Sequence, residues 1–320
     1  MFAPFDIIRV VVGAAILYLG ADWLIRGSTG TARWLGVKPL IIGLTVVAYG
    51  TSAPELAVST KAMLAHQEPI ALGTVIGSCI ANISLVLGLT ALIAPPTIDG
   101  RIIRREVPVL LGSVVALPLC LRDGEIGRFE GAILIGCAVL FTLVTLTVSA
   151  RSGAADTLSV PRVAAEPTSR TRFALIALPM MALGLALLII GSNLFVEGAR
   201  SVAFRFQMSD RMLGLTVVAI GTAMPELIAS LVAALRGHAG LAVGTVIGSN
   251  LMNVFLVLGV CAYISPIRVG EKSHTIDFIG LIVITLLGVI TLRGPRQVRR
   301  FEGAILVLAY VGFVIAASIF

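Results

Sequence analysis

One sequence feature constrains the fold more than any other: a proline–glutamate pair stands inside an apolar run, twice. The segment GLTVVAYGTSAPELAVS covers residues 43–59, and GLTVVAIGTAMPELIAS covers residues 214–230. The two segments agree at 12 of 17 positions and lie 171 residues apart. Proline breaks a helix because it lacks a backbone N–H, and a buried carboxylate is costly. Neither residue belongs in a plain apolar helix, so the pair requires a specific explanation.

The repeat extends well beyond these two segments. GTVIGSCIANISLVLG at 73–88 and GTVIGSNLMNVFLVLG at 244–259 agree at 11 of 16 positions with the same offset, and RFEGAIL recurs at 128–134 and 300–306. We therefore predict two copies of one unit. The first copy is expected at 1–149 and the second at 171–320, joined by a polar linker at 150–170 that is rich in Ala, Ser, Pro and Arg.

Composition places both copies in a lipid bilayer. Of the 320 residues 58% are hydrophobic and 13% are charged, whereas a soluble domain carries about 25% charged residues. The apolar residues form blocks of about 20, which is the length of a membrane-spanning helix. We predict an all-α polytopic membrane protein with ten transmembrane helices, at 6–26, 37–65, 70–93, 102–121, 126–149, 171–197, 209–236, 241–264, 274–293 and 300–319.

Five spans per copy imply that the second copy enters the membrane from the opposite side. The predicted arrangement is thus an inverted repeat, as in many secondary transporters. With Lys and Arg assigned to alternate sides, 15 fall on the side of the linker and 9 on the other. The positive-inside rule then predicts a multi-pass protein of the cell (inner) membrane with a cytoplasmic linker and both termini outside.

Several classes of partner are not expected. The net charge of +7 comes from short loops rather than one basic face, so nucleic acid is not predicted as a partner. The four cysteines show no zinc or redox spacing, and no cofactor is expected. The lipid bilayer is the expected surrounding, and we expect a monomer. The three histidines lie at span ends or in loops, at His66, His238 and His274.

Pro54 and Pro225 each remove the N–H that would pair with the carbonyl four residues earlier, on Gly50 and Gly221. Broken helices are tolerated at membrane depth where they line a cavity, and freed carbonyls there are good cation ligands. The repeated motif therefore favours two helix breaks that face an ion path.

Glu55 and Glu226 lie near the middle of their predicted spans. A single such residue could be a protonated structural glutamate, but two at equivalent places favour an ion path. Polar residues four positions apart accompany them and are expected to share a helix face. These are Thr51 with Glu55, Thr222 with Glu226, Ser78 with Asn82, and Ser249 with Asn253.

An inverted repeat would bring these side chains together at the membrane centre. The resulting set of donors consists of oxygen atoms, which suit hard cations, and Ca²⁺ takes about 6–8 oxygen ligands. Two carboxylates would balance the charge of one Ca²⁺, while carbonyl and hydroxyl oxygens also suit Na⁺. No His or Cys constellation offers a soft-metal site.

GTSAPEL with GSCIANI, and GTAMPEL with GSNLMNV, resemble the paired repeats of the cation/calcium exchanger superfamily. The chain is most similar to the compact prokaryotic sodium/calcium exchangers. This resemblance implies ten helices, inverted five-helix repeats and midplane ion sites on the second, third, seventh and eighth helices. It also implies transported Ca²⁺ and Na⁺ as the substrates.

The resemblance implies a role for each matching residue. Glu55 and Glu226 would bind both ions, Thr51 and Thr222 would help to hold Ca²⁺, and Ser52, Ser78 and Ser249 would bind Na⁺. Asn82 and Asn253 would complete the central site, and the carbonyls near Ala48 and Ala219 would also contact Na⁺.

Three positions depart from the pattern of the superfamily. Ala223 stands where the second repeat usually has a serine, and Cys79 replaces an asparagine that Asn250 keeps. Some relatives have an aspartate at one of the positions held here by Asn82 and Asn253. A missing hydroxyl weakens the case for Na⁺ more than for Ca²⁺, so H⁺ or a different number of Na⁺ ions stays open as the driving species.

The predicted function is an alternating-access antiporter in which Ca²⁺ and the driving ion compete for oxygens around Glu55 and Glu226. One alternative keeps the fold but couples H⁺ to Ca²⁺ or another divalent cation. A passive cation channel is an alternative from another class. An intramembrane enzyme with an acid dyad is disfavoured, because the flanking Asn and Ser resemble ligands and H-E-x-x-H is absent.

Overall fold

The computed structural model describes residues 4–97, 100–120, 124–152, 170–205, 219–268, 275–293 and 297–319. The described residues of the first half form α1 (Pro4–Leu35), α2 (Pro39–Ile42), η1 (Gly43–Val47), α3 (Ala48–Thr51), α4 (Ala53–Leu64), α5 (Glu68–Ala81), η2 (Asn82–Val86), α6 (Leu87–Ile93), α7 (Gly100–Cys120), β1 (Glu125–Ile126) and α8 (Arg128–Ser152). The segments labelled η are π-helical turns.

The second half follows the same order. Its described elements are α9 (Arg170–Arg205), α11 (Ala219–Thr222), α12 (Met224–Leu235), α13 (Ala239–Met252), η4 (Asn253–Val257), α14 (Leu258–Ile264), β2 (Ile267–Arg268), α15 (Thr275–Leu292) and α16 (Arg300–Ile319). Part of the predicted span 209–236 and most of the predicted linker 150–170 lie outside the described residues.

Seven helices of the described residues are long and apolar enough to cross a membrane, against the ten predicted spans. They lie at Ile8–Leu35, Pro39–Leu64, Glu68–Ile93, Arg128–Val148, Leu175–Phe195, Ala239–Ile264 and Arg300–Ala317. Helices also occupy the other three predicted ranges, as α7, α12 and α15. The first helix continues to Leu35, well past the predicted end of its span at residue 26.

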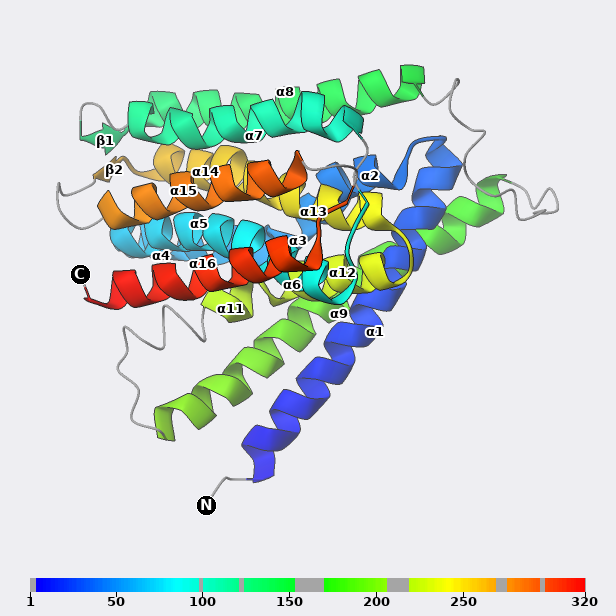
Figure 1. Cartoon of the computed structure of the whole chain (residues 1–320), viewed down its shortest axis with the longest axis horizontal. Coiled ribbons are helices and arrows are strands. Elements are labelled where there is room, and N and C mark those ends of the chain that lie inside the picture. The colour runs from blue at the N-terminus through cyan, green and yellow to red at the C-terminus, as the bar shows by residue number, and fades with distance from the viewer. Residues whose placement is uncertain are drawn as a thin grey trace.

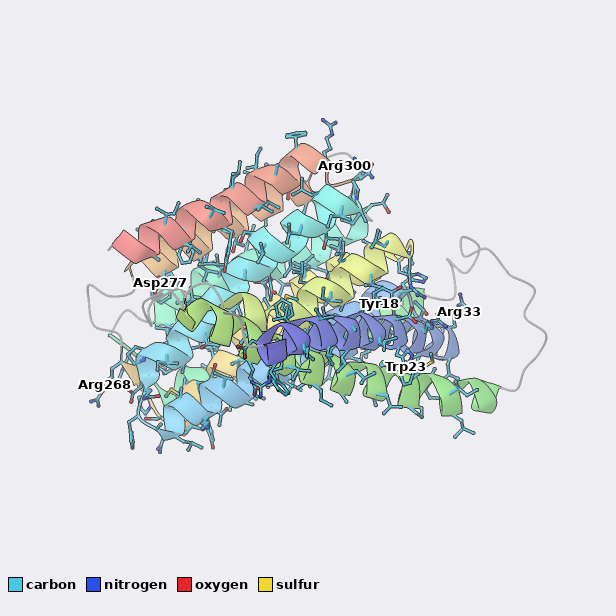
Figure 2. All side chains as sticks on the ribbon, turned by 90° about the horizontal axis from the view of Figure 1, so that it is seen from below. Tyr18, Trp23, Arg33, Arg268, Asp277 and Arg300 are labelled. Carbon is cyan, nitrogen blue, oxygen red and sulfur yellow. The ribbon has the colours of Figure 1, made fainter. Side chains whose placement is uncertain are left out.

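The surface of the bundle is apolar, as a bilayer requires. Large hydrophobic side chains such as Phe129, Leu175 and Leu308 are about 70% exposed, which water would not favour over so wide an area. Tyr18 and Trp23 lie on the outer face of α1, while Arg33 and Arg268 lie at opposite ends of the molecule (Figure 2). We call the end where α8 stops and α9 starts the linker end.

Contacts between the two halves recur in equivalent pairs. β1 pairs antiparallel with β2, with Glu125 opposite Arg268, and Thr97 pairs with Gln297 at the other end of α15. The sequence repeat relates these two pairings, because its offset of 171–172 residues makes Thr97 equivalent to Arg268 and Glu125 equivalent to Gln297. Gly88 of α6 packs against Gly303 of α16, and the equivalent Gly259 of α14 packs against Gly131 of α8.

Helices α1 and α9 form a separate antiparallel pair that runs obliquely beside the other helices (Figure 1). Glycines allow their backbones to touch. A Cβ atom on Gly20 would lie 2.8 Å from the backbone nitrogen of Leu188, and one on Gly184 would lie 2.4 Å from that of Leu24. The repeat relates Gly13 to Gly184 and Gly20 to Gly191, so the same small residues serve both helices.

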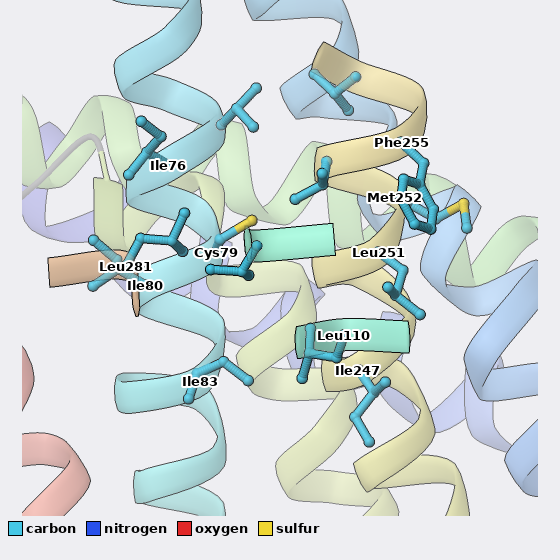
Figure 3. Close-up of a cluster of buried hydrophobic side chains, with 14 of the residues drawn as sticks. Ile76, Cys79, Ile80, Ile83, Leu110, Ile247, Leu251, Met252, Phe255 and Leu281 are labelled. Carbon is cyan, nitrogen blue, oxygen red and sulfur yellow. The ribbon is translucent and has the colours of Figure 1, made fainter. Parts of the chain in front are cut away.

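Helices α5 and α13 lie side by side inside the bundle, within one large cluster of buried hydrophobic side chains (Figure 3). Ile80 of α5 and Ile83 of η2 belong to this cluster and contact α15, next to Gly280 and Gly288. α13 is buried on nearly all sides, whereas α8 and α16 lie on the outside. The polar residues of the repeated motifs therefore lie in the most enclosed part of the molecule.

Candidate cation site

Two helix breaks of the same shape carry the two glutamates. Ser52 separates α3 from α4 with φ −82° and ψ 1°, and Ala223 separates α11 from α12 with φ −82° and ψ 0°. The proline follows in the first turn of the next helix, where its missing N–H costs nothing. Glu55 and Glu226 thus lie in the first turns of α4 and α12, where a helix N-terminus favours negative charge.

The structure at the first break corrects two expectations. Thr51 and Glu55 were expected on one helix face, but the helix breaks at Ser52, so Thr51 is the last residue of α3 and Glu55 lies in the first turn of α4. The Gly50 carbonyl was expected to lack a helical partner, yet it accepts a backbone N–H at the C-terminal cap of α3. The N–H of Ser52 bonds to the Ala48 carbonyl at 3.0 Å, as in a regular helix. The backbone at the end of α3 therefore satisfies the one carbonyl that Pro54 would leave unpaired.

Residues from both halves meet at this point. The hydroxyls of Thr51 and Ser249 lie 3.2 Å apart, which joins α3 to α13 across 198 residues of sequence. Both hydroxyls lie beside the Glu226 carboxyl group. Glu55 is close enough to Glu226 for the two carboxylates to repel each other when both are charged. The two acids therefore belong to one site.

Asn82 and Asn253 begin the π-helical turns η2 and η4, at equivalent places of the two copies. α12 packs against η2, and α4 packs against η4. The helix that bears each glutamate therefore contacts the π-helical turn that bears the asparagine of the other copy. π-helical turns are uncommon and often occur at functional sites. No pattern in the sequence predicted them, because the residues NISLV and NVFLV suit an ordinary helix equally well.

The buried polar atoms of this site are largely unpaired. Among the described residues, these atoms have neither solvent exposure nor a hydrogen-bond partner: the hydroxyl of Ser52, both carboxyl oxygens of Glu55 and Glu226, and the amide groups of Asn82 and Asn253. Burial of so many polar groups is expensive unless something binds them. Carboxylate, amide and hydroxyl oxygens at one buried point fit a hard cation.

The remaining predicted residues lie nearby. Ser78 is buried in α5, four residues before Asn82, and Thr222 ends α11 directly before the second break. Ala48 begins α3, and Ala219 begins α11 with only its backbone described. The structure thus brings the predicted residues to the crossing of four spans, while their roles as ligands stay predictions.

Cys79 occupies the place that Asn250 holds in the second copy. Its thiol points from α5 toward α13 (Figure 3) and lies 3.8 Å from the Asn250 carbonyl oxygen. The Asn250 amide instead bonds within its own helix, to the Val246 carbonyl at 2.8 Å. The contact between α5 and α13 at this point therefore involves the Cys79 thiol and the Asn250 backbone carbonyl, and not the Asn250 side chain.

A charged cluster lies between α1 and the bundle toward the linker end. Asp22 of α1 forms ion pairs with Arg236, which follows α12, and with Arg26, at 3.0 Å on its own helix. Burial and the nearby guanidinium groups of Arg33 and Arg236 lower the pKa of His238, so this imidazole is neutral at pH 7. The contact is one-sided, because α1 packs along α12 whereas α9 barely contacts α4 among the described residues.

Comparison with known proteins agrees with this architecture. The model of the family described as sodium/calcium exchanger protein matches residues 5–147 and 176–319. CaxA of Alkalimonas amylolytica is 39% identical over 309 residues, covering 96% of each chain. The inner membrane protein YrbG of Escherichia coli strain K12 is 35% identical over 307 residues, covering 94% of this chain and 93% of YrbG.

A solved structure has the same fold. The sodium-calcium exchanger NCX_Mj, soaked with 10 mM Na⁺ and 10 mM Sr²⁺, superposes with a TM-score of 0.83 at 30% identity. The match covers 98% of this chain and 99% of that one. The two halves of the family match coincide with the two halves of the sequence repeat. This chain is a membrane protein that belongs to the sodium/calcium exchanger family.

Proposed function

We propose that the protein is a secondary active antiporter that exchanges Ca²⁺ for Na⁺ by alternating access. The observation that carries this proposal is the pair of buried, unpaired carboxyl groups of Glu55 and Glu226 at equivalent helix breaks. The family description and the Na⁺ and Sr²⁺ soak of NCX_Mj support the choice of ions. An antiporter of this kind moves ions and has no catalytic residue.

The proposed architecture is ten transmembrane helices in two inverted five-helix repeats, at 1–149 and 171–320, joined by the linker at 150–170. The equivalent contacts between the halves support an inverted relation, because β1–β2 and Thr97–Gln297 lie at opposite ends of α15. For the cell (inner) membrane, the charge bias of the loops supports a proposed orientation with the linker in the cytoplasm and both termini outside.

The proposed ion site comprises Glu55, Glu226, Thr51, Thr222, Ser52, Ser78, Ser249, Asn82, Asn253 and the backbone at Ala48 and Ala219. Ca²⁺ and the driving ion compete for the two carboxylates. Reorientation occurs when cations balance these charges, because bare carboxylates are prohibitively costly to move through a dry barrier. The glycine-lined pair α1 and α9 is the proposed moving gate.

The driving ion is tested by ⁴⁵Ca²⁺ uptake into proteoliposomes under an outward Na⁺ gradient or, separately, an outward H⁺ gradient. We expect Na⁺-driven uptake that stops when the gradient is collapsed, since an antiporter needs its counter-ion. Uptake that only the H⁺ gradient drives would identify the H⁺-coupled alternative. Uptake that proceeds without either gradient, at rates far above the turnover rate of an alternating-access transporter, would identify a passive channel and contradict the proposal.

H⁺ coupling is a second candidate because of Ala223. Ala223 is buried at the second break. At the first break the equivalent residue is Ser52, which has an unpaired hydroxyl. The site therefore has one hydroxyl fewer for Na⁺. Ala223→Ser adds that oxygen, and under the Na⁺-coupled proposal it lowers the Na⁺ concentration required for half-maximal uptake.

The ion pair between Asp22 and Arg236 holds α1 against α12 toward the linker end. If the gate moves in transport, this pair must separate before the site opens toward the linker. We expect Arg236→Gln to raise the turnover of Ca²⁺ uptake roughly twofold to fivefold, within the range of a partly exposed ion pair. Arg26→Gln is the matched control, because its ion pair with Asp22 stays within α1. Equal effects of the two variants, or slower uptake in Arg236→Gln, would contradict the gating role.

A further inference from the structure

Ser192 is a buried residue of α9 that contacts the second helix break. Its hydroxyl donates a hydrogen bond to the Gly221 carbonyl oxygen at 2.7 Å. This is the carbonyl that Pro225 cannot pair, because proline lacks the N–H four residues later. The hydroxyl therefore satisfies a backbone group that the motif itself exposes, next to Thr222 and five residues before Glu226.

This use of a hydroxyl differs from that of many Ser and Thr residues in the spans. Thr45, Thr245 and Ser84 bond to the carbonyl four residues earlier in their own helices, at 2.6, 2.9 and 2.5 Å. Such local bonds are the usual choice for hydroxyls in helices. The Ser192 hydroxyl instead connects α9 to α11, two elements that are otherwise in limited contact.

The connection exists in one copy of the repeat. The offset of 171 residues relates Ser192 to Ala21 of α1, which has no hydroxyl. The equivalent Gly50 carbonyl is satisfied by a backbone N–H, and the first break has its own unpaired hydroxyl at Ser52. In the second copy Ala223 replaces Ser52, and the nearby hydroxyl comes from α9 instead.

We propose that Ser192 is a positioning residue. Through its hydrogen bond to Gly221, it couples the position of α9 to the conformation of the helix break that precedes Glu226. The inference rests on the proposed function, since it assumes that α9 belongs to the moving gate. In the present structure α1 covers α12 toward the linker end and the Ser192–Gly221 bond is formed. The bond therefore stabilises this state, and its loss shifts the population toward the state that opens to the linker side.

The test is the apparent KM for Ca²⁺ on each face of Ser192→Ala in proteoliposomes of known orientation. Loss of one hydrogen bond corresponds to roughly a fivefold change in an equilibrium. We expect the KM to rise on the face away from the linker and to fall on the linker face, by up to about fivefold. Ser192→Thr keeps the hydroxyl and should restore both values, whereas Asn193→Ala, at an exposed neighbouring position, should leave both unchanged.

A merely structural defect would raise the KM or lower turnover on both faces, and that result would overturn the inference, as would unchanged values. Absence of Ca²⁺ flux in the unaltered protein would instead overturn the proposed function. In that case, hydrogen–deuterium exchange of the purified protein decides on Ser192. Peptides covering residues 221–227 should exchange faster in Ser192→Ala than in Ser192→Thr. Equal exchange in the two variants would contradict the proposed link between Ser192 and the helix break.

Discussion

Replacement of Glu226 by glutamine is expected to lower ⁴⁵Ca²⁺ uptake into proteoliposomes by a factor of at least roughly 100. Glutamine keeps the shape of the side chain but removes a charge, and Ca²⁺ affinity depends strongly on the number of charged ligands. The site has two carboxylates and no exposure to solvent, so no bulk water compensates for the lost charge. Glu55→Gln is expected to have an effect of the same size, because Glu55 occupies the equivalent break.

The control for this prediction is Glu68→Gln, which alters a carboxylate in the first turn of α5, away from the breaks. It should retain uptake within a factor of about two, because Glu68 is only partly buried and partly exposed charges contribute little. Gel-filtration profiles in detergent establish that each variant is folded. Full uptake by a folded Glu226→Gln variant would exclude competition at this carboxylate and with it the proposed mechanism.

Replacement of Gly184 by valine is expected to abolish transport by separating α1 from α9. Even a Cβ atom there would lie 2.4 Å from the Leu24 nitrogen, and the contacting atoms are backbone, which cannot rotate away. Overpacking of this kind usually costs about 1–3 kcal/mol and displaces whole elements. We expect a lower midpoint of thermal unfolding in detergent and a loss of Ca²⁺ uptake of at least roughly tenfold.

Gly136→Val provides the matched control, because a Cβ atom at Gly136 of α8 meets no atom within 4 Å. It makes the same chemical change in another span and should leave both the unfolding midpoint and uptake nearly unaltered. A Gly184→Val variant with normal stability and normal uptake would show that close contact of α1 and α9 is dispensable.

Much of the site could be predicted from the repeated motif alone. Pro54 and Pro225 act on their own helices, so the two breaks follow from local chemistry. Glu55 and Glu226 are costly in an apolar segment, and their recurrence indicates a common site without reference to any partner helix. The companion residues Ser78 and Asn82, and their equivalents in the second copy, shared the same regular spacing.

Other features could not be predicted because they depend on packing between helices. The π-helical turns at Asn82 and Asn253 have sequences that an α-helix also accepts. The bend at Ser52 separates Thr51 from Glu55, although their spacing predicted one helix face. Both deviations lie where four spans cross, and this crossing depends on all four spans rather than on the sequence of one segment.

By itself, the sequence determined that there are two similar halves, each with a broken span and a carboxylate that needs a cation. These are consequences of residue type and spacing within one segment. The tertiary structure alone decided which side of the site is covered, since both halves contain nearly the same motif. That choice depends on α1 lying against α12, on the ion pair of Asp22 with Arg236, and on Ser192 reaching Gly221. Such contacts join residues far apart in the chain, and no local pattern encodes them.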